Sequence, residues 1–230
     1  MVDSKLWEAR QLVAKVGEIL LQRNLTDLAG GNISMRVEDR IVMSPTLAGP
    51  NKFWQLQPEE VLILDLEGNK LDGDGGISRE APTHLKLLNH FYPAGRAVIH
   101  AHPRNTLVFC VAQQPIPPVL EGVLKFGEIK LVEYANGGTH SEKLAENVLA
   151  GLVGQDELVA KQAAVVLAPW HGVFAIGKSL PATLDAVERI ENNAYCILMS
   201  KLLLAQTDGL EDHRQALMAA IKATRGGSGE

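Results

Sequence analysis

The segment from Ala163 to Ala168 reads AAVVLA and contains no polar side chain. A short apolar run of this kind, bounded by turn residues, predicts a strand that is buried on both faces of its sheet. The segment from Gly172 to Gly177 is also apolar, and it predicts the antiparallel partner of a hairpin. Similar short strands are mixed with helical patterns elsewhere, without a long linker or an internal repeat, so the sequence predicts a single α/β domain.

The remaining elements follow from hydrophobic periodicity and from turn residues. A first helix is predicted at 4–23, and Pro181 marks the start of a long helix that ends near residue 204. The last helical stretch reaches about residue 223, so we expect one domain over 1–224 and a disordered tail over 225–230. Further helices are predicted at 81–91, at 105–113 and from Thr139 or Ser141 to 152. Further strands are predicted at 33–37, 41–44, 61–66, 96–100 and 129–132. Residues 46–51 are predicted to be a Pro/Gly loop.

Composition and charge exclude several classes of protein. The formal net charge is −5 and no basic stripe is present, so we expect no nucleic-acid partner. No apolar run approaches the roughly 18 residues that a membrane helix needs, and the N-terminus lacks the apolar core of a signal peptide. Cys110 and Cys196 lie far apart and form no C-x-x-C motif. We therefore expect a soluble cytoplasmic protein with reduced thiols and no membrane partner.

Two histidines stand at the end of the apolar run Arg96–Ile99, in the sequence His100-Ala101-His102. Residues two apart on a strand project from the same face, so both imidazoles can bind one metal ion from the same side. Pro103 cannot donate a ladder hydrogen bond and predicts the end of the strand, which leaves the pair at an edge or mouth of the sheet. Such pairs also arise by chance or as two unrelated surface histidines, so further ligands are needed to indicate a metal site.

His171 and Glu80 are candidates for these further groups. His171 lies in the turn between the two apolar strands, where Gly172 allows the backbone to approach a ligand closely. A lone turn histidine is more often solvated than a ligand, but three histidines at element ends fit a catalytic zinc ion with an open fourth position. Glu80 precedes the helix at 81–91, and the favourable interaction of a carboxylate with the helix dipole is by itself enough to explain a glutamate at this position. The alternative is that Glu80 acts as a general acid or base beside the metal.

The turn Gly30-Gly31-Asn32 precedes the first predicted strand. Glycines in such a turn expose backbone N–H groups that can hold an anion such as phosphate, and a plain turn into a hairpin is the alternative. The dinucleotide-binding pattern G-x-G-x-x-G is absent, and so is a P-loop. No nucleotide-binding motif therefore accompanies the turn.

Four motifs follow one another in an order that is typical of one family. They are Gly31-Asn32-Ile33-Ser34, Ser78-Arg79-Glu80, His100-Ala101-His102 and His171-Gly172, with Gly177 following. Over nearly the whole chain this order resembles the class II aldolase/adducin family, in particular its L-fuculose-1-phosphate aldolase members. The resemblance implies a three-layer α/β/α sandwich around a mostly antiparallel central sheet. It also implies a homotetramer with the active site near subunit interfaces.

The resemblance also implies roles for individual residues. His100, His102 and His171 correspond to the metal ligands of the family, which implies Zn²⁺ as cofactor, with Mn²⁺ or Co²⁺ as alternatives. Glu80 corresponds to the acidic residue that can sit on the metal in the absence of substrate and that moves a proton during turnover. The substrate phosphate is then expected on Gly31, Asn32, Thr46, Ser78 and Arg79. The complete ligand set favours an active enzyme over an adducin-like interaction protein.

The sequence departs from the family pattern at three places. The phosphate loop reads Ser44–Gly49, with its glycine displaced, which leaves Thr46 to act alone. Arg79 replaces a second serine, and an arginine can hold either a phosphate or a carboxylate. Glu121 stands where the aldolases place a tyrosine that acts from the neighbouring subunit, so the residue that protonates the aldehyde oxygen stays open.

These observations favour a metal-dependent aldehyde-lyase that acts on a small sugar phosphate. The expected reaction is the reversible cleavage of a ketose 1-phosphate, such as L-fuculose 1-phosphate, into dihydroxyacetone phosphate and an aldehyde through a metal-stabilised enediolate. The alternatives are a metal-dependent decarboxylase of a 3-oxo acid or its phosphate, and a sugar-phosphate 4-epimerase or dehydratase of the same family. A non-enzymatic, adducin-like interaction protein is the third class.

Overall fold

The computed structural model describes residues 4–135, 141–204, 212 and 214–219 of the chain. Its centre is a seven-stranded sheet in the order β4-β3-β2-β1-β5-β7-β6, and every neighbouring pair of these strands is antiparallel. The family resemblance implies a mostly antiparallel sheet, and this pairing confirms it. The strands are β1 (Asn32–Val37), β2 (Arg40–Met43), β3 (Leu62–Leu64), β4 (Lys70–Asp72), β5 (Ala97–Ala101), β6 (Ala163–Ala168) and β7 (Gly172–Gly177).

The apolar hairpin forms as predicted. All residues of β6 and β7 are buried, and the strands pair along their whole length, with Ala163 opposite Gly177 and Ala168 opposite Gly172. The strand β7 also pairs with β5, which lies inside the sheet between β7 and β1. A strand that is covered on both faces has no solvent-facing side chains, and this explains the absence of polar residues in β7.

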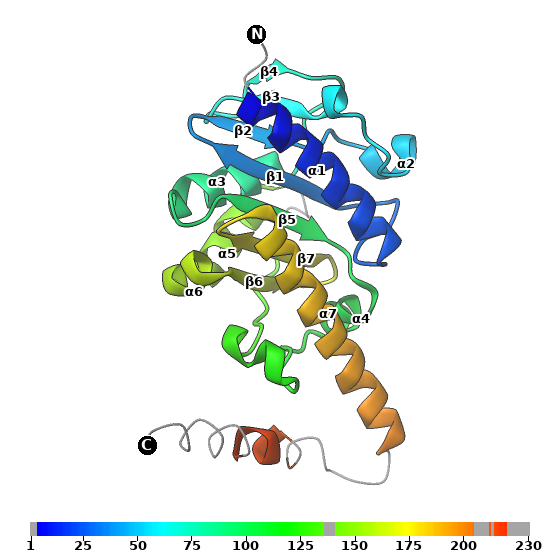
Figure 1. Cartoon of the computed structure of the whole chain (residues 1–230). Coiled ribbons are helices and arrows are strands. Elements are labelled where there is room, and N and C mark those ends of the chain that lie inside the picture. The colour runs from blue at the N-terminus through cyan, green and yellow to red at the C-terminus, as the bar shows by residue number, and fades with distance from the viewer. Residues whose placement is uncertain (1–3, 136–140, 205–211, 213, 220–230) are drawn as a thin grey trace, which may run out of the picture.

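Helices cover both faces of the sheet (Figure 1). The helices α1, α4 and α7 lie on one face, and α3, α5 and α6 lie on the other. This arrangement confirms the expected three-layer α/β/α sandwich. The helices are α1 (Ser4–Gln22), α2 (Ala48–Lys52), α3 (Ala81–Phe91), α4 (Arg104–Ala112), α5 (Glu142–Leu152), α6 (Asp156–Lys161) and α7 (Leu180–Leu203), with 3-10 helices η1 (Pro58–Glu60) and η2 (Glu121–Phe126).

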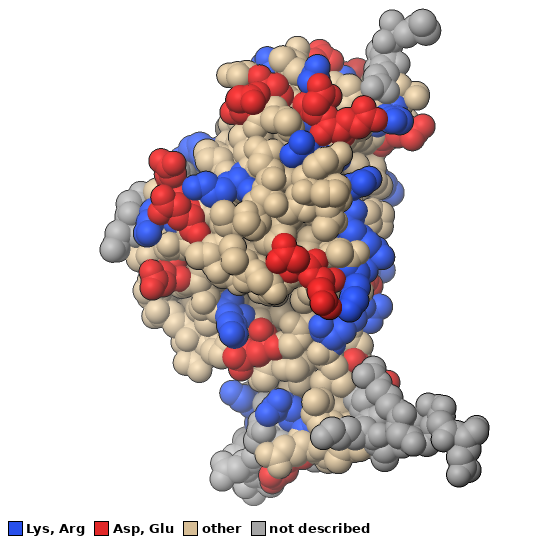
Figure 2. Space-filling model, turned by 90° about the vertical axis from the view of Figure 1, so that its left-hand side faces the viewer, with Lys and Arg blue, Asp and Glu red and all other residues tan. Residues whose placement is uncertain are grey.

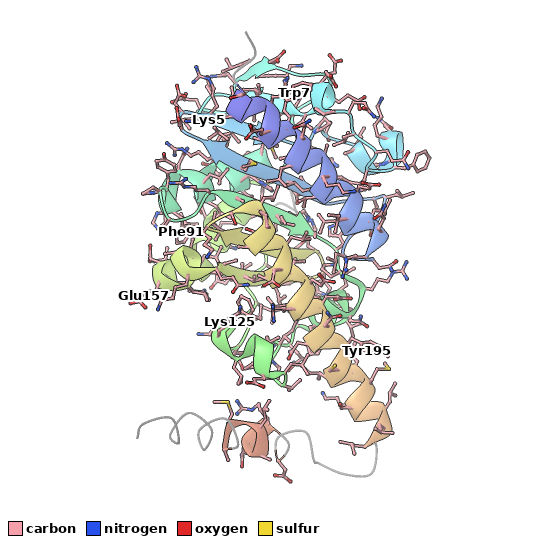
Figure 3. All side chains as sticks on the ribbon, in the orientation of Figure 1. Lys5, Trp7, Phe91, Lys125, Glu157 and Tyr195 are labelled. Atoms are coloured by element: carbon pink, nitrogen blue, oxygen red, sulfur yellow. The ribbon has the colours of Figure 1, made fainter. Side chains whose placement is uncertain are left out.

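Each helical layer has its own apolar core. Because side chains alternate along a strand, Val98 and Ile99 of β5 enter different cores. Ile99 belongs to the core beneath α1 and α7, and Val98 belongs to the core beneath α3 and α5. Side chains on the outer sides of the helices reach solvent, as Tyr195 does on α7 (Figure 3). The central strands are therefore fixed from both faces, and their ends are rigid positions for functional side chains.

Several elements differ from the sequence prediction. Residues 129–132 form no strand of the sheet, because Ile129 and Leu131 each make a single bridge, to Ile116 and to Leu167. Residues 46–51 are not all loop, since the short helix α2 begins at Ala48 after Leu47 takes a left-handed conformation with φ of 58°. The elements β4, α6 and η2 were not predicted, because each is short and mostly polar or lacks a strong periodicity.

The predicted helix ends are mostly found in the structure. The Oγ of Ser141 accepts a hydrogen bond from the N–H of Leu144 and caps α5, which selects Ser141 of the two candidate caps. Thr139 lies outside the described residues, and so does the predicted tail at 225–230. Residues 212 and 214–219 are helical, in agreement with the predicted last helix.

Two buried polar residues of α7 hold distant parts of the chain. The carboxylate of Glu191 accepts hydrogen bonds from the backbone N–H groups of Asn105 and Thr106 and from both of their side chains, at 2.7–2.9 Å. The amide of Asn193 bonds three backbone groups, the N–H groups of Val119 and Leu120 and the carbonyl of Pro117. These contacts fix α4 and the proline-rich connector against α7.

The surface carries both signs of charge. On the face that Figure 2 shows, Lys and Arg side chains occur together with Asp and Glu side chains, with uncharged areas between them. Within the described part of the chain, no helix combines the length and the apolar character that crossing a bilayer requires.

Candidate metal centre

Strand pairing brings the predicted metal ligands together. The strand β5 ends at Ala101, so His100 lies at its end and His102 directly after it. The strand β7 is the neighbour of β5 and begins at Gly172, directly after His171. The ring centroid of His171 therefore lies 4.5 Å from that of His100 and 5.5 Å from that of His102, although these residues are far apart in the sequence.

The histidines direct nitrogen atoms toward one point. The Nδ1 atom of His100 lies 2.9 Å from the carbonyl oxygen of Val173, and because a carbonyl only accepts, Nδ1 carries the proton and Nε2 presents a lone pair. The Nε2 atom of His102 lies 3.1 Å from that Nε2 atom. One nitrogen each from His100, His102 and His171 lies within 4.8 Å of the others, the geometry of a group that can hold a metal ion.

Glu80 lies beside the histidines at the start of α3. Its Oε1 lies 3.0 Å from the Nε2 atom of His171, and its Oε2 lies 3.4 Å from the Nε2 atom of His100. The side chain of Asn32 donates hydrogen bonds to Oε2 at 2.6 Å and to Ser78 at 3.2 Å. Oε1 is buried and has no assigned hydrogen-bond partner among the described residues. A buried anionic oxygen of this kind fits a bound cation.

The protonation states also fit a metal ion. Burial lowers the pKa of His100 well below its usual value, and it lowers the pKa of His102 as well. Burial alone would raise the pKa of Glu80, but attraction to His100 and His171 in their protonated forms and the hydrogen bond from Asn32 outweigh it, so this pKa lies below its usual value. Neutral imidazoles and an ionised carboxylate are the forms that bind metal ions. The set of nitrogen donors with one carboxylate is suited to Zn²⁺ and similar ions.

Glycines make room for the ring of His102. A Cβ atom at Gly30 would lie 2.0 Å from Cε1 of this ring, and a Cβ atom at Gly172 would lie 2.7 Å from its Cδ2. Gly31 has a φ of +95°, and a Cβ atom there would lie 2.7 Å from Oγ1 of Thr26. The sequence predicts close backbone approach at Gly172, and the structure shows that the approach is to the carbonyl oxygen of Ala101, which would lie 2.4 Å from a Cβ atom there, and to the histidine rings.

A cavity of about 260 Å³ opens at the cluster. Four of the predicted phosphate-binding residues line it, namely Gly31, Thr46, Ser78 and Arg79. The fifth, Asn32, directs its side chain to Glu80 and Ser78. Arg79 is exposed and makes no hydrogen bond or ion pair with another described residue, so its guanidinium is available to an anionic ligand. Glu121 does not line this cavity and lies at the start of η2.

Asp27 binds two backbone amides at the start of the glycine turn. Its Oδ1 accepts hydrogen bonds from the N–H groups of Ala29 and Gly30 at 2.8 and 2.9 Å. The anion that binds these amides is therefore a carboxylate of the chain itself. Asp27 does not belong to any of the metal-ligand or phosphate-binding patterns of the sequence, although an aspartate two or three residues before a glycine turn is a typical signal of side-chain capping.

A buried histidine next to the site makes the fold sensitive to acid. His84 is fully buried on α3, and its Nδ1 lies 2.7 Å from Oγ of Ser34. Burial lowers its pKa from 6.5 to about 4, against the opposing charge of Glu80. Below pH 6.5 the unfolded chain binds more protons than the folded chain, so stability falls as the pH falls toward 4. We expect the metal-free protein to lose about 2 kcal/mol from this group between pH 7 and pH 5.

Urea unfolding of the metal-free protein at both pH values measures this loss. Between pH 7 and pH 5 the unfolding free energy of the His84→Asn variant should fall by about 2 kcal/mol less than that of the wild type. His90→Asn serves as the control, because His90 is exposed on the same helix. Equal pH dependence in the His84→Asn variant and the wild type would contradict the prediction.

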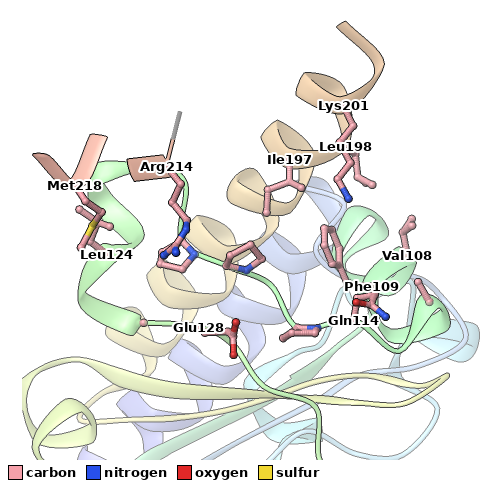
Figure 4. A pocket seen from close by; sticks show the side chains of 15 residues that line it. Val108, Phe109, Gln114, Leu124, Glu128, Ile197, Leu198, Lys201, Arg214 and Met218 are labelled. Carbon is pink, nitrogen blue, oxygen red and sulfur yellow. The ribbon is translucent and has the colours of Figure 1, made fainter. Parts of the chain in front are cut away.

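A larger cavity, of about 670 Å³, lies between α4, α7 and η2 (Figure 4). Its lining is mainly apolar and includes Val108, Phe109 and Ile197. Its charged members are Glu128, Lys201 and Arg214. It contains none of the clustered histidines. The smaller cavity is therefore the candidate site, because it combines concave shape with converging polar groups.

Comparison with solved structures supports the fold. The chain is similar to L-fuculose 1-phosphate aldolase, with a TM-score of 0.74 and 22% identity over 92% of this chain and 96% of that one. It is also similar to L-fuculose-1-phosphate aldolase from Thermus thermophilus, with a TM-score of 0.68 and 23% identity over 89% and 98% of the two chains.

Comparison of sequences extends the similarity to two activities. The chain is 29% identical over 195 residues to 3-oxo-tetronate 4-phosphate decarboxylase of Haemophilus influenzae. The aligned region covers 80% of this chain and 84% of that protein. It is 28% identical over 187 residues to L-fuculose phosphate aldolase of the same organism. The aligned region covers 79% of this chain and 76% of that protein. Residues 11–198 match the family described as Class II Aldolase and Adducin N-terminal domain. This match spans most of the chain, and the protein therefore belongs to the class II aldolase and adducin family.

Proposed function

We propose that this protein is a metal-dependent carbon–carbon lyase, and that it reversibly cleaves a ketose 1-phosphate into dihydroxyacetone phosphate and an aldehyde. The observation that carries the proposal is the convergence of His100, His102, His171 and Glu80 at one small cavity. The similarity to L-fuculose phosphate aldolase of Haemophilus influenzae supports this reaction and makes L-fuculose 1-phosphate a first substrate to test.

The histidines would hold the metal, and Glu80 would complete its binding in the absence of substrate. When bound, the ion supplies several kcal/mol of Lewis-acid stabilisation to the negative charge that develops on the substrate oxygens during cleavage. Zn²⁺ suits these ligands, with Mn²⁺ or Co²⁺ as alternatives.

Glu80 has the position and the charge of the proton carrier. In the cleavage direction the C4 hydroxyl releases its proton as it becomes the aldehyde carbonyl, and the electron pair of the broken C3–C4 bond stays on C3. The Glu80 carboxylate, after it has taken up a proton from solvent, delivers that proton to C3. In the synthetic direction the carboxylate removes the same proton, which requires the ionised form that a lowered pKa favours. The hydrogen bond from Asn32, at 2.6 Å, fixes the orientation of the carboxylate for both transfers.

A second candidate reaction is the decarboxylation of a 3-oxo acid phosphate. The observation that favours it is the side chain of Arg79, which lines the cavity without a protein partner among the described residues. A guanidinium can form a bidentate pair with a carboxylate as well as with a phosphate. The similarity to 3-oxo-tetronate 4-phosphate decarboxylase supports this candidate as well.

One assay separates the two candidates. The purified protein is analysed for bound zinc, manganese and cobalt, and it is then incubated with a set of ketose 1-phosphates and with a 3-oxo acid phosphate. Aldehyde release from a ketose 1-phosphate supports the aldolase, and release of carbon dioxide from the acid supports the decarboxylase. A protein with neither activity and no bound metal would contradict the proposed function and favour the adducin-like class.

Arg79 should contribute mainly to substrate binding in either reaction. We expect Arg79→Gln to raise KM for the anionic substrate by about 10–100-fold, because a charge-assisted hydrogen bond contributes roughly 1.5–3 kcal/mol. Steady-state kinetics measures this change. Arg40→Gln is the control, because Arg40 pairs with Asp39 at the far end of β2. An unchanged KM in the Arg79→Gln variant would exclude Arg79 from substrate binding.

A homotetramer with the site near subunit interfaces completes the proposal. Large apolar side chains are exposed beside the cavity, including those of Leu28 and Leu47, which belong to its lining. Trp170, which precedes the ligand His171, is 53% exposed and packs edge-to-face on Tyr134. Exposed aromatic and aliphatic side chains at a site support burial against another subunit.

We further propose a cytoplasmic location and a small sugar phosphate as the ligand.

A further inference from the structure

The carboxylate of Asp27 touches both the glycine turn and a metal ligand. Its Oδ1 accepts hydrogen bonds from the N–H groups of Ala29 and Gly30, and the same atom lies 3.5 Å from Nδ1 of His102. The Asp27 side chain is half exposed, with 51% of its surface accessible. An exposed aspartate is usually mobile, but two backbone donors fix this carboxylate in place.

The ring of His102 is held differently from the ring of His100. His100 is fully buried, stacks on Phe174 with centroids 4.3 Å apart, and donates to the Val173 carbonyl. His102 lies between Gly30 and Gly172, whose missing side chains leave a slot for the ring. Glycines confine the plane of the ring, but they provide no partner for its Nδ1 atom. The charged group that faces that atom is the carboxylate of Asp27.

We propose that Asp27 is a positioning residue for the metal centre. It keeps the proton of His102 on Nδ1, so that the Nε2 lone pair points toward the Nε2 atoms of the other histidines, and it makes Nε2 a stronger donor. A carboxylate in this position typically changes metal affinity by about 10–100-fold when it is removed. The proposal rests on the metal site of the proposed function, and it does not depend on which substrate is cleaved.

The competing explanation is that Asp27 only caps a turn. Asp65 provides a matched comparison, because its Oδ1 accepts hydrogen bonds from the N–H groups of Glu67 and Asn69 at 3.0 and 2.8 Å in a turn that contains no histidine. An asparagine keeps an oxygen that can accept the two backbone hydrogen bonds, and it lacks the negative charge. Substitution by asparagine at both positions therefore separates turn capping from an effect on the metal.

The experiment measures metal binding by the full-length protein without substrate. Apo protein of the wild type and of the Asp27→Asn, Asp27→Ala and Asp65→Asn variants is titrated with Co²⁺ and with Zn²⁺ against a competing chelator, and the visible spectrum of bound Co²⁺ is recorded. We expect both Asp27 variants to bind about 10–100-fold more weakly, with an altered Co²⁺ spectrum for Asp27→Asn. The Asp65→Asn variant should bind as the wild type does, and thermal unfolding of the apo proteins should be unchanged by Asp27→Asn.

Each contrary result has a distinct meaning. Wild-type affinity and spectrum in the Asp27→Asn variant would overturn the positioning role. Weaker metal binding by Asp27→Ala alone would also overturn it, because turn capping would then explain the whole effect of Asp27. Equal weakening by Asp65→Asn and Asp27→Asn would likewise overturn it. Absence of Co²⁺ and Zn²⁺ binding in the wild type would instead contradict the metal site itself, and with it the proposed function.

Discussion

The His171→Ala variant should lose its metal ion and about 10³-fold in kcat/KM for the cleaved substrate. Loss of a ligand removes most of the Lewis-acid stabilisation, and a loss of roughly 4 kcal/mol corresponds to this factor. His171 is the best ligand to test, because it lies in the turn before β7 and its buried Nδ1 has no hydrogen-bond partner among the described residues. Its removal breaks no internal hydrogen bond at Nδ1, whereas the ring of His100 is fully buried against Phe174.

Metal content by mass spectrometry, circular dichroism and steady-state kinetics together test this expectation. The variant should keep the wild-type spectrum in circular dichroism and contain little metal after dialysis. His90→Ala is the matched control, because His90 is an exposed histidine on α3 outside the cluster. Full metal content and full activity in the His171→Ala variant would contradict both the ligand assignment and the proposed mechanism.

The Glu191→Ala variant should lose about 3–4 kcal/mol of unfolding free energy. Helix α4 begins at Arg104 after Pro103, and no side chain of its own first turn caps it. The Glu191 carboxylate takes that role from α7, since it accepts from the backbone N–H groups of Asn105 and Thr106. Its removal leaves buried donors without an acceptor and removes a negative charge from the N-terminus of a helix.

Thermal and urea unfolding measure this loss, which corresponds to a decrease of roughly 10 °C in Tm for a chain of this size. Glu191→Gln should have an intermediate effect, because the amide keeps one acceptor oxygen. Glu157→Ala is the control, because the Glu157 side chain is 88% exposed and pairs, within the described part of the chain, only with Lys161 on its own helix. A Glu191→Ala variant as stable as the control would show that α4 does not depend on this contact.

The parts of the fold that local sequence patterns determine could be predicted. The hairpin of β6 and β7 follows from two uninterrupted apolar runs, and the position of His100 and His102 follows from the end of a third. The short strand β4 could not be predicted in this way, because all three of its residues are exposed and it lacks an apolar face. It is held in the sheet by its pairing with β3, where Asp72 lies opposite Ile63.

The parts of the site that depend on distant contacts could not be predicted. Glu191 is an acidic residue in a helical sequence, and nothing near it in the chain indicates that its partners lie in α4. The role of Asp27 depends on β5 ending beside the glycine turn, which places His102 within 3.5 Å of its carboxylate. The need for glycine at position 30 also depends on a distant contact, because the ring of His102 occupies the space that a side chain there would fill.

The central position of β5 affects how the chain reaches its native state during synthesis. One edge of β5 pairs with β1, where Asn32 lies opposite His100, and the other edge pairs with β7, where Phe174 lies opposite the same histidine. Contacts between segments so distant in the sequence give a high contact order and slow folding, typically in milliseconds to seconds. Until the ribosome has released β7, the apolar edge of β5 has no partner and is exposed to aggregation. The candidate metal centre is thus among the last regions of this chain to become complete.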